Sequence, residues 1–230
     1  MQKKISPAPA ILRLWFSKVS ASTLAAENAV PQMLSVSEQD RLNAIGSKTR
    51  RREYLLSRAL MRRALSQCFP RQEHEWRVED RPGSTPVVSN LPAGGHISLS
   101  HSHGCICFAI SACPLGIDIE AADKERDFAA LAEVFMNDEE MACLAANKSL
   151  QADYFYRVWS AKEAYYKMLS RAEQSAMSLQ QIRYSELSAK DSCGYLYEGR
   201  LGDFVVAAMM PAKPERISRN YFLLAEKCLE

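Results

Sequence analysis

G-I-D-I-E, residues 116–120, is the stretch that decides which fold this chain adopts. Its isoleucines alternate with carboxylates, which predicts a β-strand because successive side chains of a strand point to opposite faces. Asp118 and Glu120 would therefore leave one face together, roughly 7 Å apart at their Cα atoms. The isoleucines indicate an apolar underside, so this would be an interior strand that carries acids. Buried acids cost desolvation free energy unless something positive binds them.

W-S-A-K-E-A-Y-Y-K, residues 159–167, predicts a helix. Trp159, Glu163 and Lys167 would share one face of it because they lie four residues apart. Carboxylates and a lysine around one space suit a divalent cation and a phosphate ester, since Mg²⁺ takes oxygen ligands and substrate phosphates. Each pattern alone is common: an acidic pair on a strand is most often a solvated edge, and Glu163 with Lys167 could be an ordinary surface ion pair.

Residues 96–104 alternate polar and apolar side chains and lead into an apolar run, which predicts a β-hairpin that turns at residues 102–104. Ser100 and His101 would lie at the strand end, where hydroxyl, imidazole and backbone N–H groups suit phosphate oxygens. Three histidines in this run make a zinc site the alternative. Their spacing gives no helical i, i+4 ligand pair, and no nearby carboxylate or C-x-x-C completes a set.

Four motifs follow one another in a fixed order: S-L-S-H-S at 98–102, G-I-D-I-E at 116–120, F-x-x-x-E at 135–139, and W-S-x-K-E-x-x-x-K at 159–167. In this order and spacing they resemble the 4′-phosphopantetheinyl transferase superfamily. The resemblance is to its long, monomeric type, which activates carrier domains of fatty acid, polyketide and nonribosomal peptide synthases. It is close over residues 83–167 and weak before residue 45 and after residue 175.

The resemblance implies that the 4′-phosphopantetheine arm of coenzyme A moves to a serine hydroxyl of an apo acyl, peptidyl or aryl carrier protein. Adenosine 3′,5′-bisphosphate would leave. It implies Mg²⁺ as cofactor, with Mn²⁺ as a substitute. From the length and composition of the chain we expect a monomeric cytoplasmic enzyme without a nucleic-acid or membrane partner. The implied fold is α/β (α+β), a pseudodimer of two similar halves. Residues 1–113 would contribute to coenzyme A binding and residues 114–230 would carry the metal and catalytic motifs, with the active site at their junction.

The resemblance also assigns roles to the acidic residues. Asp118, Glu120 and Glu163 would hold the metal, with Glu139 nearby through water. Glu163 would also accept the proton of the attacking serine, because a carboxylate within hydrogen-bond reach is worth about 10²–10⁴ in rate. Metal binding weakens a carboxylate as a base, so a relay through a metal-bound water stays open as the alternative. Lys167 would meet the pyrophosphate and offset charge on the leaving oxygen.

Two further motif residues would face the nucleotide end of coenzyme A. Ser100 and His101 would grip its phosphates, and His101 would meet the 3′-phosphate. Lys162 is part of the helix motif, but its side chain would point about 100° away from that of Glu163. A phosphate contact and a structural ion pair are therefore both open for Lys162.

A basic cluster at residues 48–63 holds seven Lys or Arg and one acid, with apolar residues at helical spacing. The phosphates of coenzyme A call for such charges, although a solvated face or a nucleic-acid or membrane patch would look similar. The family's helix arginine is assigned to Arg51 or Arg52, with Arg58 next. The family's Gly-Lys-Pro segment has no direct counterpart, and Arg81, before a proline, is preferred to residues 85–86.

Composition fits a cytoplasmic enzyme. A net charge of +2 is too mild to imply nucleic acid by itself, and no run approaches 18 apolar residues. Seven scattered cysteines without a C-x-x-C indicate reduced thiols.

Two other functions were weighed against the motifs. A divalent-metal nuclease would need a lysine two residues after the strand acid, where this chain has Ala122. A non-catalytic coenzyme A or nucleotide-binding module would not need Glu163, Glu139 and the acidic pair together.

Periodicity and turn residues predict the remaining elements. The N-terminal apolar stretch is expected to be an edge strand, and residues 36–44 a short helix with Ser37 as its N-cap. Residues 153–170 are expected to form the long helix that carries the W-S-x-K-E motif. Residues 182–185, 194–200 and 203–210 are expected to be closing strands.

Overall fold

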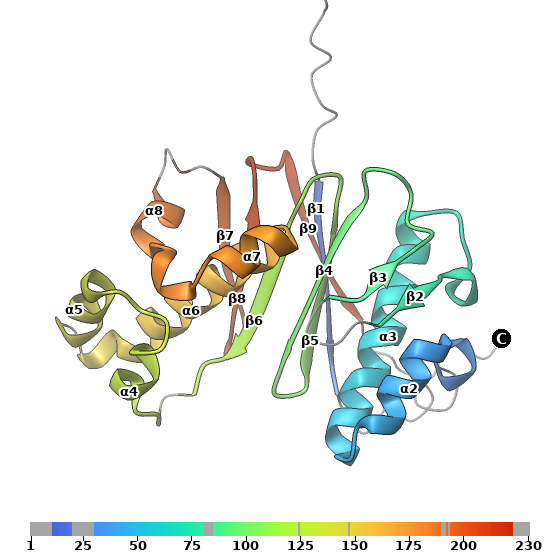
Figure 1. Cartoon of the computed structure of the whole chain (residues 1–230), viewed down its shortest axis with the longest axis horizontal. Helices are drawn as coiled ribbons and strands as arrows, with labels where there is room; N and C mark the ends of the chain where they lie inside the picture. Colours follow the sequence, from blue (N-terminus) through green and yellow to red (C-terminus); the bar gives the residue numbers. More distant parts are fainter. Residues whose placement is uncertain are drawn as a thin grey trace, which may run out of the picture.

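The computed structural model describes residues 11–19, 30–80, 85–123, 125–146, 148–189, 192 and 194–222. It is a mixed α/β arrangement in which two larger sheets lie side by side (Figure 1). Helices α2 and α3 lie beside the first sheet, and α4 to α8 gather beside the second (Figure 1). Among the described helices, none is both long and apolar enough to span a bilayer.

The first sheet has the strand order β4-β5-β1-β9, built from β4 (His96–Ser102), β5 (Cys105–Ser111), β1 (Ile11–Lys18) and β9 (Arg216–Phe222). The predicted hairpin is confirmed, since β4 and β5 pair antiparallel around the turn at His103 and Gly104. The prediction that the N-terminal strand is an edge strand is wrong. β1 pairs with β5 on one side and runs parallel to β9 on the other, and the sequence had not indicated β9.

The second sheet has the order β6-β8-β7, from β6 (Gly116–Ala121), β8 (Phe204–Met210) and β7 (Tyr195–Leu201). The apolar underside predicted for the G-I-D-I-E strand is confirmed, because Ile117 and Ile119 are fully buried. They share one core cluster with Leu12 and Leu14 of the first sheet. One face of each sheet therefore contributes to a common core.

A long helix covers the other face of each sheet. α3 (Lys48–Cys68) packs Leu56 and Leu60 against Phe108 of the first sheet. α6 (Gln151–Met168) packs Phe155 and Tyr156 against the second sheet. These two helices face the cavity described below.

α2 (Val36–Ala44) precedes α3 and has the predicted bounds, but Ser37 is not its N-cap. The N-cap is Ser35, whose side chain accepts the Glu38 N–H while Glu38 reaches back to the Ser35 N–H. This reciprocal pair satisfies two N–H groups that the first turn leaves open. The serine three residues before the glutamate therefore begins the helix.

The closing region differs from its prediction in one place. Residues 182–185 are not a strand, because the chain forms η5 (Leu179–Gln181) and then α8 (Tyr184–Ser188). Ile182, Tyr184 and Leu187 are buried against the α6 core. The remaining elements are η2 (Val30–Met33), η3 (Glu73–Glu75), β2 (Val78–Glu79), β3 (Val87–Val88), α4 (Phe128–Ala132), α5 (Asp138–Ala146), η4 (Lys148–Leu150) and α7 (Arg171–Ala176).

The order of elements repeats along the chain. β1, α3, β4 and β5 are followed later by β6, α6, β7 and β8, and the last strand of each set lies between the other two. All four of these strand pairings are antiparallel. β9 then returns to the first sheet, and the division into halves at residues 113 and 114 stays a prediction.

Candidate active site

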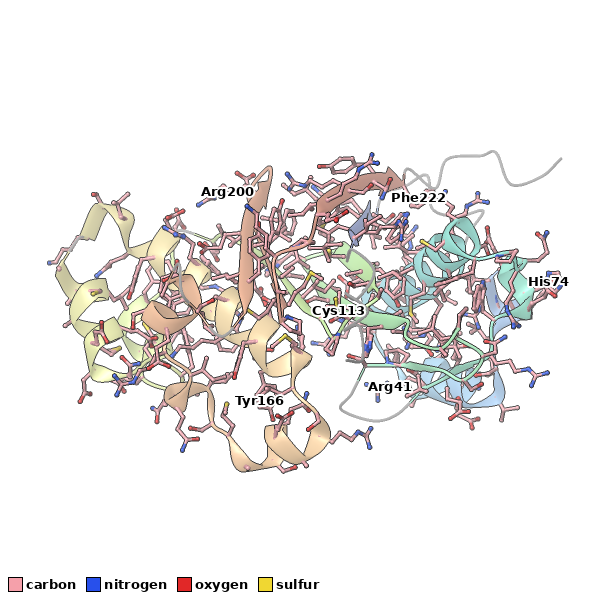
Figure 2. All side chains as sticks on the ribbon, turned by 90° about the horizontal axis from the view of Figure 1, so that it is seen from above. Arg41, His74, Cys113, Tyr166, Arg200 and Phe222 are labelled. Carbon is pink, nitrogen blue, oxygen red and sulfur yellow. The ribbon has the colours of Figure 1, made fainter. Side chains whose placement is uncertain are left out.

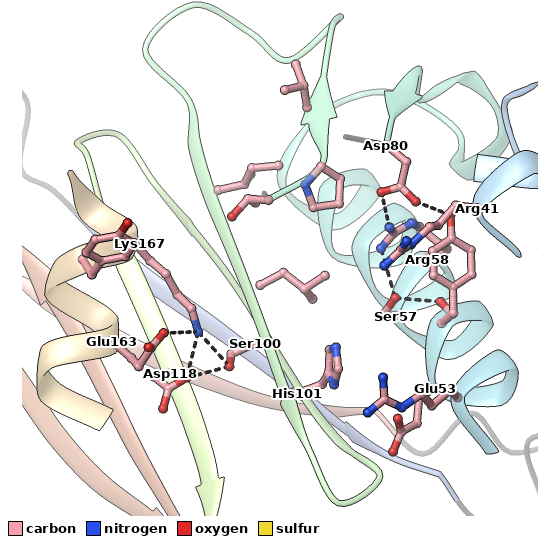
Figure 3. Close-up of a pocket in the computed structure, with 18 of the residues that line it drawn as sticks. Arg41, Glu53, Ser57, Arg58, Asp80, Ser100, His101, Asp118, Glu163 and Lys167 are labelled. Carbon is pink, nitrogen blue, oxygen red and sulfur yellow. Dashed lines mark hydrogen bonds and ion pairs between the residues drawn. The ribbon is translucent and has the colours of Figure 1, made fainter. Parts of the chain in front are cut away.

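A cavity of about 750 Å³ lies where the two sheets and the helices α3 and α6 meet. Six of the residues singled out from the sequence motifs line it together: Ser100, His101, Asp118, Glu120, Glu163 and Lys167. Figure 3 labels all of them except Glu120. Seen from above, Arg41 and Tyr166, which also line the cavity, lie on the same side of the molecule (Figure 2). The structure therefore joins the strand and helix motifs in one space.

Asp118 is the most deeply placed of the acids and is only 2% exposed. Its Oδ1 accepts hydrogen bonds from Ser100 Oγ at 2.8 Å and from Lys167 Nζ at 2.8 Å. Its Oδ2 is buried and has no hydrogen-bond partner among the described residues. A buried carboxylate oxygen without a partner costs free energy, so this atom is suited to a ligand that brings positive charge.

Glu120 is held from both sides. Its Oε2 accepts from Ser102 Oγ at 2.8 Å, and its Oε1 accepts from Trp159 Nε1 at 3.3 Å. Burial raises the pKa of Glu120, and the neighbouring charge of Asp118 adds to this increase. As predicted, Asp118 and Glu120 leave β6 on the same face, toward the cavity.

Glu163 and Lys167 come from one face of α6. Lys167 Nζ lies 3.7 Å from Glu163 Oε2 and also donates to Ser100 Oγ at 3.2 Å (Figure 3). Burial raises the pKa of Glu163, with the Lys167 charge acting against it. Burial works to lower the pKa of Lys167, but the surrounding carboxylates, Asp118 first, outweigh it and the pKa is raised. Lys167 therefore stays protonated between the acids.

His101 lines the cavity on the side of α3. Neighbouring protein atoms that displace water lower the pKa of His101, Glu53 acts in the opposite direction, and Lys167 and Arg50 add to the decrease. Its imidazole is therefore neutral at neutral pH and can donate one hydrogen bond to a phosphate.

Whether the acids fit a metal ion can be judged from their donor atoms. Three carboxylates converge in the cavity, and oxygen donors are what Mg²⁺ takes. The partnerless Oδ2 of Asp118 supports this fit. Within the described part of the chain, however, no three His, Cys, Asp or Glu side chains are arranged closely enough to hold a metal as they stand. The ammonium of Lys167 lies among the acids instead.

Lys162 is not brought into this space. It is fully buried, and its Nζ donates to Phe135 O at 2.8 Å and to Glu140 Oε2 at 2.5 Å. Because successive helix residues are turned by about 100°, Lys162 leaves a different face of α6 from its neighbour Glu163 and points to Glu140 of α5. The sequence left a phosphate contact and a structural ion pair open for Lys162, and in the structure Lys162 forms the ion pair, with Glu140.

Glu139 is exposed in the first turn of α5 and is absent from the described cavity lining. Arg51 and Arg52 in α3 are also absent from the described cavity lining, although both are half-buried rather than exposed. Arg51 Nη1 donates to Leu42 O at 2.5 Å and so ties α3 to α2. Arg81 lies outside the described residues.

Arg58 lines the cavity, but its charge is already balanced. Its Nη2 is 2.5 Å from Asp80 Oδ1 (Figure 3). Its Nε is 3.2 Å from Glu38 Oε1. Glu38 also binds the fully buried Arg62. Arg58 therefore belongs to a buried ion-pair network that forms one wall of the cavity.

Three arginines that the sequence prediction missed line the cavity within the described residues: Arg41, Arg50 and Arg171. Arg50 lies in the first turn of α3, after the N-cap Ser47, and Arg41 comes from α2. Both are exposed. Arg50 belongs to the basic cluster at residues 48–63, so the sequence did indicate it. Which of the adjacent arginines faces the cavity depends on how α3 is rotated against the sheet, which the sequence does not show.

Comparisons with known proteins agree with the motifs. Residues 114–207 match the family model described as the 4′-phosphopantetheinyl transferase superfamily. The chain is 31% identical over 135 residues to the 4′-phosphopantetheinyl transferase psf-1 of Bacillus pumilus, covering 59% of this chain and 57% of that protein. It is 32% identical over 113 residues to the 4′-phosphopantetheinyl transferase Sfp of Bacillus subtilis (strain 168), covering 49% and 50%.

A third relative is the 4′-phosphopantetheinyl transferase ffp of Bacillus subtilis, 29% identical over 146 residues, covering 58% of this chain and 64% of that protein. The chain thus spans between half and two thirds of the length of these relatives. The resemblance to the 4′-phosphopantetheinyl transferase superfamily, which the order of the motifs predicts, is confirmed.

Proposed function

We propose that this chain transfers the 4′-phosphopantetheine arm of coenzyme A to a serine hydroxyl of an apo carrier protein and releases adenosine 3′,5′-bisphosphate. One observation carries the proposal: Asp118, Glu163 and Lys167 converge in one cavity that basic side chains border. Phosphoryl transfer depends mainly on positioning and on neutralising charge, and this cavity offers both. The relatives, each a 4′-phosphopantetheinyl transferase by name, support the same reaction.

Asp118, Glu120 and Glu163 are the residues that would hold Mg²⁺, or Mn²⁺ in its place. The bound cation would neutralise charge on the coenzyme A pyrophosphate. Support comes from the partnerless Oδ2 of Asp118 and from the oxygen-only donor set. Glu139 is left out of this set because its exposed side chain is absent from the described lining.

Lys167 would neutralise the leaving oxygen. An ammonium has three N–H donors. Two of those of Lys167 are directed to Asp118 Oδ1 at 2.8 Å and to Ser100 Oγ at 3.2 Å. The third donor makes no hydrogen bond among these contacts, since Glu163 Oε2 lies 3.7 Å from the nitrogen, and it would serve a pyrophosphate oxygen. Ser100 already gives its hydroxyl proton to Asp118, so we assign Ser100 to orienting that acid as well as to the phosphate side of the cavity.

Glu163 would accept the proton of the carrier serine, directly or through a water. Its side chain is 22% exposed against 3% for Asp118, so an incoming hydroxyl can reach Glu163 more readily. The raised pKa of Glu163, which burial causes, makes it a stronger base than an ordinary carboxylate. Coordination to a metal would weaken it again, which keeps the water relay open.

Arg41, Arg50 and His101 would bind the phosphates of coenzyme A. All three line the cavity, and both arginines are exposed. Arg41 and Arg50 would thus take the phosphate-binding role that the sequence analysis expected of Arg51 and Arg52. Arg58 would stabilise the cavity wall through its buried ion pairs.

Replacing Arg41 and Arg50 together by alanine is expected to raise the KM for coenzyme A about 10-fold or more, because charge-assisted phosphate contacts are lost. The KM for the carrier protein should change much less. Steady-state kinetics with each substrate varied in turn checks this. Lys48→Ala removes a charge from the same helix end outside the described lining and serves as the control. An equal rise in both KM values would assign the arginines to the carrier surface instead.

The repeated order of elements supports a pseudodimer with its active site at the junction of two α/β halves. One chain then supplies both walls of the cavity, which supports action as a monomer. The five cysteines within the described residues are free thiols, in keeping with a reducing, cytoplasmic setting.

The proposed reaction is tested by incubating an apo carrier protein with this chain, coenzyme A and Mg²⁺. The carrier should gain the mass of one phosphopantetheine arm, and EDTA should prevent the gain until Mg²⁺ is restored. An unchanged carrier mass at every metal concentration would count against the proposal.

A further inference from the structure

Three serines on one face of β4 join the two sheets. β4 and β6 lie next to each other, but the two strands belong to separate sheets (Figure 1). Ser98, Ser100 and Ser102 alternate along β4 and are 1%, 6% and 8% exposed. Residues two apart on a strand share a face, so all three point toward β6. We call these three residues the serine seam.

The seam supports the backbone of β6 at its two ends. Ser98 Oγ accepts the Ile117 N–H at 3.1 Å, and Ser102 Oγ accepts the Ala121 N–H at 3.3 Å. These side-chain bonds satisfy buried backbone donors that a strand-to-strand ladder would otherwise satisfy. The seam therefore fixes how far β6 lies along β4.

The same serines hold the acids. Ser100 donates to Asp118 Oδ1, and Ser102 donates to Glu120 Oε2, both at 2.8 Å. Ser98 differs because its bond to β6 goes to backbone only. Thus two members of the seam orient a carboxylate and the third does not, which supplies a matched internal control.

Ser102 has a complete set of partners. Its hydroxyl proton goes to Glu120, and its oxygen accepts the Ala121 N–H. His103 Nδ1 lies 3.0 Å from the same oxygen and donates to it in the tautomer that carries hydrogen on Nδ1. Two incoming donors polarise the hydroxyl toward Glu120. With Trp159 on its other oxygen, Glu120 has one preferred orientation.

We propose that Ser102 is a positioning residue for the metal site, acting through Glu120 without touching coenzyme A or the carrier serine. This inference rests on the proposed function, because it assumes that Glu120 binds the cation. Groups that hydrogen-bond a ligating carboxylate fix its direction, and their loss typically costs about 10–100-fold in metal affinity. Ser102→Ala would leave Glu120 with Trp159 as its remaining donor among these contacts.

The test is the affinity for Mn²⁺ in the presence of coenzyme A and without a carrier, so that no turnover occurs. Electron paramagnetic resonance of free Mn²⁺ gives the dissociation constant, and thermal unfolding is followed in parallel. Ser102→Ala should weaken Mn²⁺ binding about 10–100-fold. Ser102→Thr keeps the hydroxyl and suits a strand, so it should restore most of the affinity. Ser98→Ala should leave Mn²⁺ affinity unchanged.

The outcomes separate this inference from the proposed function. Mn²⁺ binding by the wild type that is lost in Asp118→Asn but unchanged in Ser102→Ala would overturn the role of Ser102 alone. Equal losses in Ser102→Ala and Ser98→Ala would also overturn it, because the seam would then only hold the strands together. If the wild type and Asp118→Asn bound Mn²⁺ equally, the proposed metal site itself would be wrong.

Discussion

Asp118→Asn is expected to lower the rate of arm transfer by about 10³-fold or more while the chain stays folded. The substitution keeps the shape of the side chain but removes a buried charge to which Lys167 and Ser100 both donate. It also removes the oxygen that has no partner among the described residues. The rate is measured from the mass gain of an apo carrier protein over time.

The fold is expected to tolerate Asp118→Asn because the Lys167 charge that it leaves behind is partly exposed and still has Glu163 at 3.7 Å. Thermal unfolding of the variant is therefore the control, and its Tm should stay close to that of the wild type. A variant that keeps near-normal transfer with Mg²⁺ would remove Asp118 from the metal site. A variant that loses activity only because it unfolds would leave the assignment without support.

Gly116→Ala is expected to destabilise the protein by roughly 3–5 kcal/mol, because β6 crosses α6 too closely for a side chain. A Cβ at this position would overlap the carbonyl oxygen of Ala164 and lie 2.6 Å from Met168 N. Both obstacles are backbone atoms of α6, which cannot move aside as a flexible side chain would. The free energy of unfolding from a denaturant titration measures the effect.

Gly46→Ala is the matched control, since a Cβ there meets nothing within 4 Å among the described residues. It should leave the free energy of unfolding almost unchanged. Gly116→Ala should also lower the transfer rate in protein that remains folded, because α6 carries Glu163 and Lys167 and a shift of about 1 Å can cost 10²-fold. Equal stability of the two variants would contradict the close packing of β6 on α6.

Local patterns predicted the parts of the site that depend on local geometry. Alternation in G-I-D-I-E placed Asp118 and Glu120 on one face of a strand, and four-residue spacing placed Glu163 beside Lys167. The turn at residues 102–104 followed from its glycine. Each of these relations is fixed by the repeat of a single element, which a sequence displays directly.

Relations between distant segments could not be predicted in this way. Nothing in the sequence of β1 tells that β9, about 200 residues later, pairs with it and makes it an interior strand. The burial of Lys162 depends on Glu140, which comes from another helix. The choice of Arg41 and Arg50 over Arg51 depends on how α2 and α3 pack, because Arg51 is occupied by carbonyls at the end of α2.

The most direct test of the central claim compares the wild type with Glu163→Gln by intact-mass spectrometry. An apo carrier protein is incubated with coenzyme A, Mg²⁺ and either form of the chain. The account predicts that the wild type adds one phosphopantetheine mass and that Glu163→Gln adds it at least about 10²-fold more slowly. Failure of the wild type to modify any of several apo carriers while it still binds coenzyme A would contradict the account.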